Sequence, residues 1–479
     1  MKNIIFCLTI LLVLTQCTQA SKENENLVQE RVVRLENHIQ PNLQIHKDSI
    51  QDIQYFNIEN RMKELEVPGL SVAVINNGVV EWAKGYGMAD IAENRKVTSE
   101  TLFQAGSISK PVAATRALQL YENGTIDLDK NVNDYLTSWK LPDNTFTVEE
   151  KVTTRRILDH SAGLTVWGFP GYKKWKKIPS IPEVLDGKGN TDSVRVYKKP
   201  GESWMYSGGG YTIMQQMICD MEQKSFPQIM QENVLNPLGM TTSTYVNPLP
   251  EKYHDMAATG YDFDGTEVDG KWNIYPEMAA AGLWSTPTQL AIWGNEILQI
   301  YNSQEDGILK AKTVNEMLTI STGDYGLGVV TDELVVGHNG ADAGFRAKWA
   351  SWKKEGITIV MMTNYNNNSI FREVLLSIVQ EYNLPGIYPK TRIIREQSKE
   401  DLKRFVGKYD FMDRGIAKLI VNNNELEFSA GPFSEKIYLL PENDTTFFNK
   451  NSGTYYYFQL KNGEPIGVKY ASYEGEKID

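Results

Sequence analysis

Cysteine is scarce in this chain of 479 residues, which has it at positions 7, 17 and 219 only. Two of the three fall within the first 20 residues, so Cys219 is the one internal thiol once that segment is set aside. A single thiol cannot build a disulfide framework, and this excludes a small fold held together by disulfides. Cys219 lies in the apolar stretch 214–221, which predicts a core residue.

Histidine and positive charge are also in short supply. None of the 5 histidines has the His-x-His or His-Glu-x-x-His spacing of common zinc sites, so we expect no metal and no other cofactor. The net charge of -11 lacks the basic footprint of a nucleic-acid-binding protein, and we expect no nucleic-acid partner. One dense basic run, Lys173 to Lys177, is interpreted as a solvated loop, with a role at a cleft mouth as the alternative.

Long apolar runs are missing except near the N-terminus. Lys2 precedes an apolar run over residues 4–14, which is too short to span a bilayer but typical of a secretory signal. We predict a signal peptide over residues 1–20 and an exported protein, either periplasmic, anchored in the outer membrane or secreted. Cleavage after Ala20 stays open, but we favour lipoprotein processing at Cys17, because a cysteine directly after such a run is rare by chance. Any membrane contact is then made through this signal or a lipid anchor at Cys17.

The remaining chain is too long for one compact core, so we expect more than one domain. Residues 21–44 are polar and predict a flexible tether. From 45 to 385, strand-like segments stand at both ends, around 70–85 and 335–363, with helices and loops between them. This order predicts an α+β domain, in which an antiparallel sheet is flanked by helices and a helical region is inserted in it.

A different texture follows this domain. Residues 386–402 are charged and predict a linker. From 403 to 479, short strand-like runs alternate with Asn, Gly and Pro, which is typical of a small all-β domain with a barrel-like or sandwich arrangement.

The most informative motif is Ser107-Ile108-Ser109-Lys110. A glycine precedes it, and the helical spacing that follows ends at Asn123-Gly124, so Ser107 is placed near a helix N-terminus. Residues three apart share one helix face, which puts Lys110 beside the Ser107 hydroxyl as a proton carrier beside a nucleophile. The motif alone is weak, because Ser-x-x-Lys recurs at Ser351 and because a capping serine with an exposed lysine has the same pattern.

Two further signals follow in order along the chain. Tyr206 and Ser207 stand before a glycine-rich turn, and a tyrosine near a lysine can accept the proton of a serine. His338-Asn339-Gly340 comes directly after a strand-like pair, where a glycine lets a substrate approach and the next amide, that of Ala341, can complete an oxyanion hole with the Ser107 amide.

With Ser-x-x-Lys, Tyr-Ser-x and His-x-Gly in this order, the chain resembles the serine β-lactamase-related superfamily. It is most similar to the branch that holds class C β-lactamases, DD-peptidases, D-aminopeptidases and esterases of that fold. The resemblance covers roughly residues 50 to 385, and the C-terminal part resembles the small accessory domains that often follow this catalytic unit. Three further segments carry the resemblance: Val152 to Leu164, Asn236 to Met240 and Ala279 to Thr286.

The resemblance implies acyl transfer through a covalent intermediate on Ser107. Lys110 and Tyr206 would share the general-base and general-acid work, and which of them takes the first proton stays open. The amides of Ser107 and Ala341 would hold the oxyanion. His338 would orient Tyr206 or contact the substrate, together with Asn339, Gly340 and Ser207. His160 is interpreted as structural. The substrate would be a small ester, an amide or a peptide.

Gly208 is a departure from the family pattern, which usually has asparagine as the third residue of the tyrosine motif. Loss of that amide removes a donor and an acceptor that β-lactams and acyl-D-alanine peptides use. The departure favours an esterase, a D-aminopeptidase or a carboxypeptidase over a true β-lactamase. It also supports a second hypothesis, a catalytically idle module on the same fold that binds cell wall or acyl ligands. An α/β-hydrolase is unsupported, since the chain has no Gly-x-Ser-x-Gly elbow.

Overall fold

The structure is a computed structural model that describes residues 25–47, 54–411, 415–423, 425–430, 436–450, 452–470 and 473–479. The expected signal peptide and its two processing sites, Ala20 and Cys17, lie outside these residues. The described chain divides into two compact units, one with residues up to 36 and from 58 to 371, the other with residues 37 to 57 and from 372 onward.

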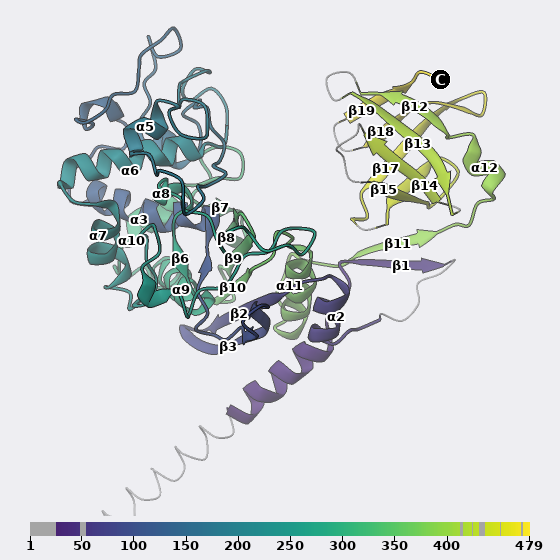
Figure 1. Ribbon diagram of the computed structural model, residues 1–479, viewed down its shortest axis with the longest axis horizontal. Helices are drawn as coiled ribbons and strands as arrows, with labels where there is room; N and C mark the ends of the chain where they lie inside the picture. The colour runs from purple at the N-terminus through teal and green to yellow at the C-terminus, as the bar shows by residue number, and fades with distance from the viewer. Residues whose placement is uncertain are drawn as a thin grey trace, which may run out of the picture. The chain divides into compact units, whose positions relative to one another are not determined.

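The first unit is built on one sheet (Figure 1). Within the described residues it has seven strands in the order β4-β3-β2-β10-β9-β8-β7, and each neighbouring pair is antiparallel. The strands are β2 (Gly69–Asn76), β3 (Val79–Asp90), β4 (Arg95–Lys96), β7 (Val330–Thr331), β8 (Val335–Asp342), β9 (Phe345–Trp352) and β10 (Ile357–Thr363). Because β2 from the start of the unit pairs with β10 near its end, the predicted α+β sheet with an inserted helical region is confirmed.

Burial explains why the central strands are apolar almost throughout. All of β10 and all but the last residue of β2 are buried, as in strands that are covered on both faces. Helix α9 (Pro287–Ser303) packs against β2, β9 and β10. At its N-terminus the Thr286 hydroxyl accepts a hydrogen bond from the Gln289 amide, and a proline stands in the first turn. Both features favour the start of a helix.

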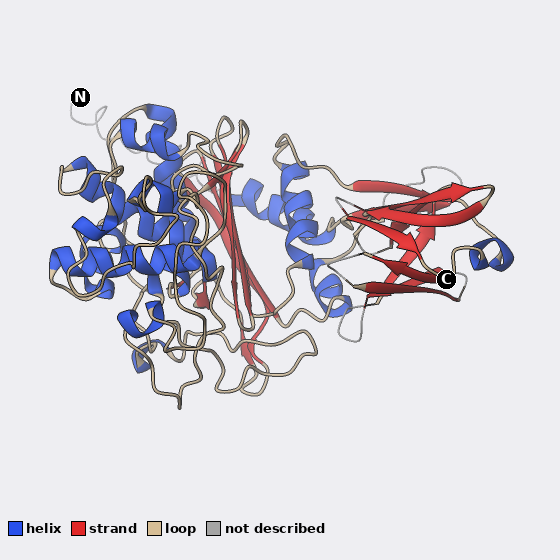
Figure 2. Cartoon of the chain, turned by 90° about the horizontal axis from the view of Figure 1, so that it is seen from above, coloured by secondary structure: helices blue, strands red, loops and turns tan. Residues whose placement is uncertain are grey.

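The inserted helical region gathers on one side of the sheet (Figure 2). From residue 58 onward, the described helices of this unit are α2 (Ile58–Glu64), α3 (Ser109–Glu122), α4 (Thr154–Leu158), α5 (Ile181–Leu185), α6 (Gly208–Glu222), α7 (Phe226–Met230), α8 (Met278–Ala281), α9 and α10 (Ala311–Met317). Short turns of other helix types are η1 (Gly106–Ile108), η2 (Val132–Asp134), η3 (Gln231–Leu235) and η4 (Glu251–Tyr253), and a small ladder joins β5 (Phe103–Gln104) to β6 (Trp284–Ser285). One apolar core runs through these helices and the sheet face beneath them.

The second unit contains a closed barrel, which confirms the predicted all-β domain. In the described part of the chain its strands are β12 (Gly407–Asp410), β13 (Ile416–Asn422), β14 (Glu425–Ala430), β15 (Ile437–Pro441), β16 (Thr446–Asn449), β17 (Tyr455–Lys461), β18 (Glu464–Tyr470) and β19 (Tyr473–Lys477). Its core is largely aromatic, with Phe405, Phe447 and Phe458 in mutual ring contact. The unit also holds β1 (Leu43–Lys47) paired in parallel with β11 (Lys390–Ile394), and α12 (Lys399–Lys403), while α11 (Ser369–Glu381) spans the boundary between the units.

The expected flexible tether over residues 21–44 is wrong where the structure describes it. Residues 25–37 form a helix, in which Val32 and Leu35 are buried. Arg31 and Glu36 pair with Glu81 and Lys84 of β3, which fixes this helix on the first unit. The polar composition hid the three-to-four-residue spacing of these few apolar side chains. The expected linker over 386–402 also differs, because it carries β11 and the start of α12.

No helix in the described part of the chain combines the length and the apolar character needed to cross a bilayer. Cys219 lies in α6 and is half-buried rather than fully enclosed, and burial raises the pKa of its thiol to about 12.

The contact between α9 and the sheet gives a test of packing. An added Cβ at Gly294 would stand 2.3 Å from Nε1 of Trp349, whose ring is held by a hydrogen bond of 2.8 Å to Ser351 Oγ. Overpacking outweighs the gain in helix propensity, so Gly294→Ala should lower the free energy of unfolding by about 1–2 kcal/mol. Urea unfolding measures this change. Gly168→Ala is the control, since its Cβ would meet nothing within 4 Å, and equal losses in both variants would contradict the account.

Candidate active site

Ser107 lies in the middle of the η1 turn, directly before α3. The turn follows β5. Ser109 holds it in place, because the Ser109 hydroxyl donates to the Gly106 carbonyl at 2.6 Å and accepts from the Leu283 amide at 3.0 Å. Tyr245 donates to the Ser109 carbonyl at 2.8 Å. These bonds fix the backbone on which the half-buried Ser107 side chain stands.

Two glycines bring strand β8 against this turn. Gly106 has φ of +52°, and an added Cβ there would lie 2.4 Å from the Ala341 nitrogen. A Cβ on Gly340 would lie 2.0 Å from the Ala105 carbonyl oxygen. Only glycine permits this backbone-to-backbone approach, which places the Ala341 amide beside the turn that carries Ser107. The two amides expected to form an oxyanion hole are therefore neighbours.

Lys110 is buried, with 2% of its surface exposed. Its Nζ donates to Ser107 Oγ at 3.0 Å and to the Ala280 carbonyl of α8 at 2.8 Å. Nζ also lies 4.9 Å from the ring centroid of Tyr206. The alternative of a capping serine with an exposed lysine does not fit this geometry, since the ammonium is enclosed and held between the serine and a carbonyl.

Tyr206 is half-buried and stands among other aromatic rings. The His160 ring lies 4.2 Å away between centroids at an interplanar angle of 34°, and the Trp167 ring lies at 5.5 Å. Trp167 is 73% exposed and Trp204 40%, so the tyrosine is flanked by apolar surface open to solvent. The arrangement can contact the apolar part of a substrate next to Ser107 and Lys110.

His160 is a scaffold for this tyrosine segment. Its Nδ1 accepts a hydrogen bond of 3.1 Å from the Ser207 amide, which puts the ring proton on Nε2. Burial, aided by the nearby Lys110 charge, lowers the pKa of the imidazole well below its ordinary value, so the ring is neutral. His160 has φ of +61°, and its neighbour Asp159 holds the bend by accepting from the amide and hydroxyl of Ser161.

His338 bonds to Tyr325 rather than to Tyr206. Its Nδ1 lies 2.6 Å from the Asn339 carbonyl, which requires a proton there, so Nε2 accepts from the Tyr325 hydroxyl at 3.1 Å. Burial, helped by the Lys110 charge, lowers the pKa of the His338 imidazole to about 3. The Tyr206 ring centroid is 6.4 Å from that of His338. A neutral histidine thus anchors a second tyrosine in the aromatic wall.

Of the remaining predicted site residues, Asn339 and Ala341 are exposed and Ser207 is buried. Asn339 and Ala341 are on the exposed face of β8, and the Asn339 side chain accepts from Lys348 at 3.2 Å. Ser207 is buried, and its hydroxyl is used as the cap of α6, accepting from the Gly210 amide at 3.0 Å and donating to the Thr165 carbonyl at 2.9 Å. The Ser207 side chain is therefore committed to structure.

Gly208 lies close to the Phe169 ring and the Trp167 carbonyl. An added Cβ would lie 3.1 Å from the Phe169 ring and 3.1 Å from the Trp167 carbonyl. That carbonyl accepts a hydrogen bond of 3.0 Å from the Gly208 amide, and Val166 accepts 3.0 Å from Gly209. A side chain at position 208 would therefore require the 166–169 segment to shift by a few tenths of an ångström.

Two buried carboxyls near the turn were missed by sequence reasoning. Burial raises the pKa of Glu277 to about 8, and within the described residues neither of its carboxyl oxygens has a hydrogen-bond partner. Burial also raises the pKa of Asp342, against the opposing effects of Lys110, Arg346 and a hydrogen bond from the Gly106 amide. Tyr325 was missed as well. None of the three lies in a motif, although the position of Asp342, directly after Ala341 on the same strand, was a usable signal.

No three histidine, cysteine, aspartate or glutamate side chains converge on a possible metal position anywhere in the described residues.

Comparison with known proteins identifies the family and the fold. The beta-lactamase family model matches residues 57–380. Penicillin-binding protein 4* of Bacillus subtilis (strain 168) is 23% identical over 438 residues, which are 84% of this chain and 92% of that protein. The octameric penicillin-binding protein homologue from Pyrococcus abyssi has a TM-score of 0.60 at 23% identity, covering 87% of this chain and 98% of its own.

A second solved structure, the beta-lactamase/D-alanine carboxypeptidase from Pseudomonas syringae, has a TM-score of 0.53 at 21% identity and covers 67% of this chain and 96% of its own. At such identities the two structures bear on the fold alone. The family match spans more than half of the sequence and contains Ser107, Lys110, Tyr206 and His338. The chain therefore belongs to the beta-lactamase family, whose members support a serine-hydrolase or penicillin-binding-protein-like function here.

Proposed function

We propose that this protein is a serine hydrolase that cleaves an ester or an amide through an acyl-enzyme on Ser107. The observation that carries the proposal is the buried Lys110 ammonium, bonded at 3.0 Å to Ser107 Oγ and at 2.8 Å to the Ala280 carbonyl. Burying a lysine is costly unless it is paired, and here a catalytic serine is one of its partners.

In the acylation step, Ser107 Oγ forms a bond to the substrate carbonyl carbon and gives up its proton. The acceptor is either Lys110 Nζ as a neutral amine or the Tyr206 oxygen as a phenolate beside the Lys110 ammonium, and the proton then passes to the leaving alcohol or amine. The negative charge on the carbonyl oxygen is stabilised by the amides of Ser107 and Ala341, which the two glycines bring together. Water later attacks the acyl carbon, and Ser107 Oγ recovers a proton as it leaves.

The substrate class follows from Gly208 and from the exposed aromatic rings. Without an amide side chain at position 208, the site lacks the group that would hold an acylamino side chain, while Trp167 and Trp204 present apolar surface. This favours an esterase, D-aminopeptidase or carboxypeptidase over a β-lactamase. The name of the Pseudomonas relative is consistent with D-amino-acid peptides as one candidate substrate.

The place of action that we propose is the cell envelope, reached through the N-terminal signal segment, with a lipid anchor at Cys17 as the favoured form. The competing function is a catalytically idle module that binds cell wall or acyl ligands, which Gly208 alone favours.

Replacing the nucleophile should abolish turnover. Ser107→Ala is expected to lower kcat for p-nitrophenyl butyrate by at least about 1000-fold, since an acyl-enzyme can no longer form. Release of p-nitrophenol measures it, and the exposed Ser303→Ala is the control. If wild type and Ser107→Ala are equally inactive on this ester and on a panel of D-amino-acid esters and peptides, yet bind them equally well, the idle module is the better account.

The neutral state of His338 should appear in the pH dependence of stability. Between pH 6.5 and about 3 the unfolded chain protonates this imidazole and the folded chain does not, so stability falls as the pH is lowered. Relative to His338→Gln, the wild type should lose about 1.4 kcal/mol per pH unit between roughly pH 6 and pH 4. Chemical unfolding at several pH values measures this slope. The same difference obtained with His254→Gln would contradict the assignment.

Restoring the missing asparagine should not by itself create a β-lactamase. In Gly208→Asn the new Cβ meets Phe169 and the Trp167 carbonyl, so the side chain cannot enter without moving the loop. We expect hydrolysis of nitrocefin to stay within about threefold of the wild type in Gly208→Asn, and to rise at least about tenfold in the double variant Gly208→Asn/Phe169→Ala, where the ring contact is removed and only the Trp167 carbonyl has to shift slightly. Phe169→Ala alone is the control. A large gain in the single Gly208→Asn variant would show that the loop does not exclude this subsite.

A further inference from the structure

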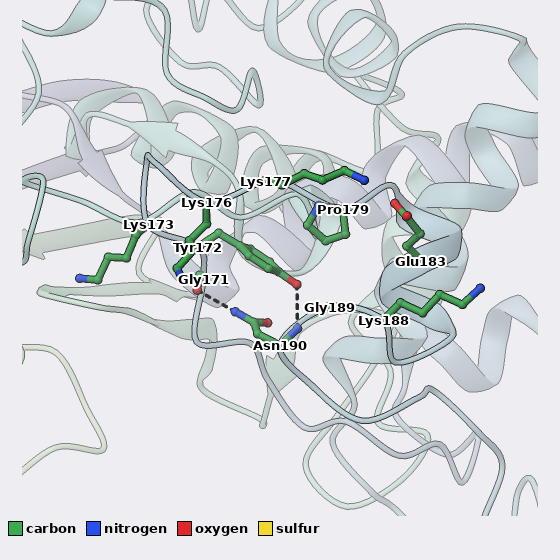
Figure 3. A pocket seen from close by; sticks show the side chains of 10 residues that line it. All are labelled: Gly171, Tyr172, Lys173, Lys176, Lys177, Pro179, Glu183, Lys188, Gly189 and Asn190. Carbon is green, nitrogen blue, oxygen red and sulfur yellow. Dashed lines mark hydrogen bonds between the residues drawn. The ribbon is translucent and has the colours of Figure 1, made fainter.

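A cavity of about 500 Å³ lies in the inserted helical region, between the 171–179 loop and the segment 183–190 (Figure 3). It is of the size that small-molecule sites usually have. Four lysines line it: Lys173, Lys176, Lys177 and Lys188. Figure 3 shows the Lys173 side chain pointing away on one side of Tyr172 and the Lys177 and Lys188 side chains pointing away on the other, where Glu183 also lies. The basic run is a loop in which residues 174–177 are exposed, as the sequence suggested, and Lys173, Lys176 and Lys177 also line this cavity.

The walls are held in place by bonds that do not involve these lysines. The Tyr172 hydroxyl accepts from the Asn190 amide at 3.1 Å, and the Asn190 side chain donates to the Gly171 carbonyl at 2.8 Å. Tyr172 also exchanges two backbone hydrogen bonds of 2.8 Å with Ile274. A Cβ on Gly189 would lie 2.2 Å from the Tyr172 hydroxyl, so the two segments close on each other only because glycine is there. The wall segments are therefore fixed by the bonds of Tyr172 and Asn190 and not by the lysines.

The lysine charges are poorly compensated. Lys173, Lys176 and Lys177 have no ion-pair partner among the described residues, and Lys188 is 3.7 Å from Asp186 in an exposed pair of the kind that contributes little. The one carboxylate in the lining, Glu183, accepts two hydrogen bonds from Ser180, which together with the charges of Lys177 and Lys188 hold its pKa below the ordinary value, so it compensates these two lysines in part. Lys176, Lys177 and Lys188 are exposed, so solvent screens their charges, but a local excess of positive charge in a chain of net charge -11 still favours an anion at this place.

The kind of anion follows from the donors. The lining contains lysines and no arginine. Arginine binds carboxylate and phosphate alike through two parallel bonds, whereas lysine acts as a point charge that needs no planar partner and also commonly binds phosphate. Four such charges spread around one cavity match separate anionic groups on one ligand. We propose that this cavity is a binding site for a ligand that carries at least two phosphate groups.

The site is separate from the Ser107 centre but is linked to it through the chain. The segment that leaves Trp167, beside Tyr206, reaches Tyr172 in the cavity wall within five residues. A Cβ on Gly171 would lie 2.6 Å from the Tyr275 ring, and the Tyr275 hydroxyl accepts from the Ala343 amide at 3.0 Å, two residues after Ala341. A ligand in the cavity therefore contacts the same loop that flanks the catalytic tyrosine.

The test is calorimetric titration of the purified protein, residues 21–479, with inorganic tripolyphosphate at low and at moderate salt. We expect saturable binding at one site per chain, weakened at least tenfold by the double variant Lys176→Glu/Lys177→Glu and weakened by added salt. The matched control, Lys312→Glu/Lys354→Glu, makes the same charge change at exposed lysines outside the cavity and should bind as the wild type does. Thermal unfolding checks that both double variants are folded.

The outcomes separate this proposal from the hydrolase function. Ser107→Ala should bind tripolyphosphate with the same Kd as the wild type, whether or not the protein hydrolyses esters. Absence of saturable binding, or equal weakening in the two double variants, would overturn the site. Tighter binding of citrate, which offers only carboxylates, than of tripolyphosphate would overturn the assignment to phosphate.

Discussion

The close approach of strand β8 to the η1 turn is the constraint on which the rest of the active site depends. Two pieces of backbone meet where Gly106 and Gly340 leave no side chain between them, and an added Cβ at either position would lie within 2.4 Å of the other segment. This approach sets the Ala341 amide beside Ser107 and lets the Gly106 amide donate to Asp342. Sheet and helical region are joined at this point, so the proposed nucleophile belongs to the helical region and half of the proposed oxyanion hole belongs to the sheet.

Around that contact, the polar groups are arranged so that the ammonium of Lys110 is the charged group most directly in contact with Ser107. The two histidines nearest to it are kept neutral by burial and by its charge. They act as fixed hydrogen-bond partners, one for the Ser207 amide and the other for Tyr325. A low-dielectric site with one dominant cation favours the negative charge that develops on a carbonyl oxygen during acyl transfer.

Much of this could be predicted from the sequence, because the informative residues are close to one another along it. The spacing of Ser107 and Lys110 placed them on one helical face, and Asn123 correctly marked the end of α3. The strand pairs on both sides of the helical region predicted the sheet. The barrel followed from its short strands. The predictions that failed concern elements that are held by few apolar side chains or by contacts between segments far apart in the chain. The helix over residues 25–37 rests on few apolar side chains and on ion pairs to β3, and neither can be predicted from a polar composition.

Roles were harder to predict than positions. His338 stands where its motif placed it, yet its partner Tyr325 comes from a segment with no motif of its own. Ser207 is used by the helix cap. Glu277 and Asp342 are acidic residues whose burial only the tertiary structure reveals. The lysine run has ordinary loop composition, and its place in a cavity wall depends on the packing of Tyr172 against Gly189. Each miss concerns a contact between segments far apart in the chain.

The central claim is that Ser107 carries the acyl group. The most direct measurement is mass spectrometry of the protein quenched by acid during turnover of p-nitrophenyl butyrate, followed by peptide mapping. The account predicts a mass increase of one butyryl group on the peptide that contains Ser107, absent after long incubation once the ester is consumed. Turnover with no adduct on that peptide at any quench time, or an adduct on another residue that disappears at the rate of turnover, would contradict it.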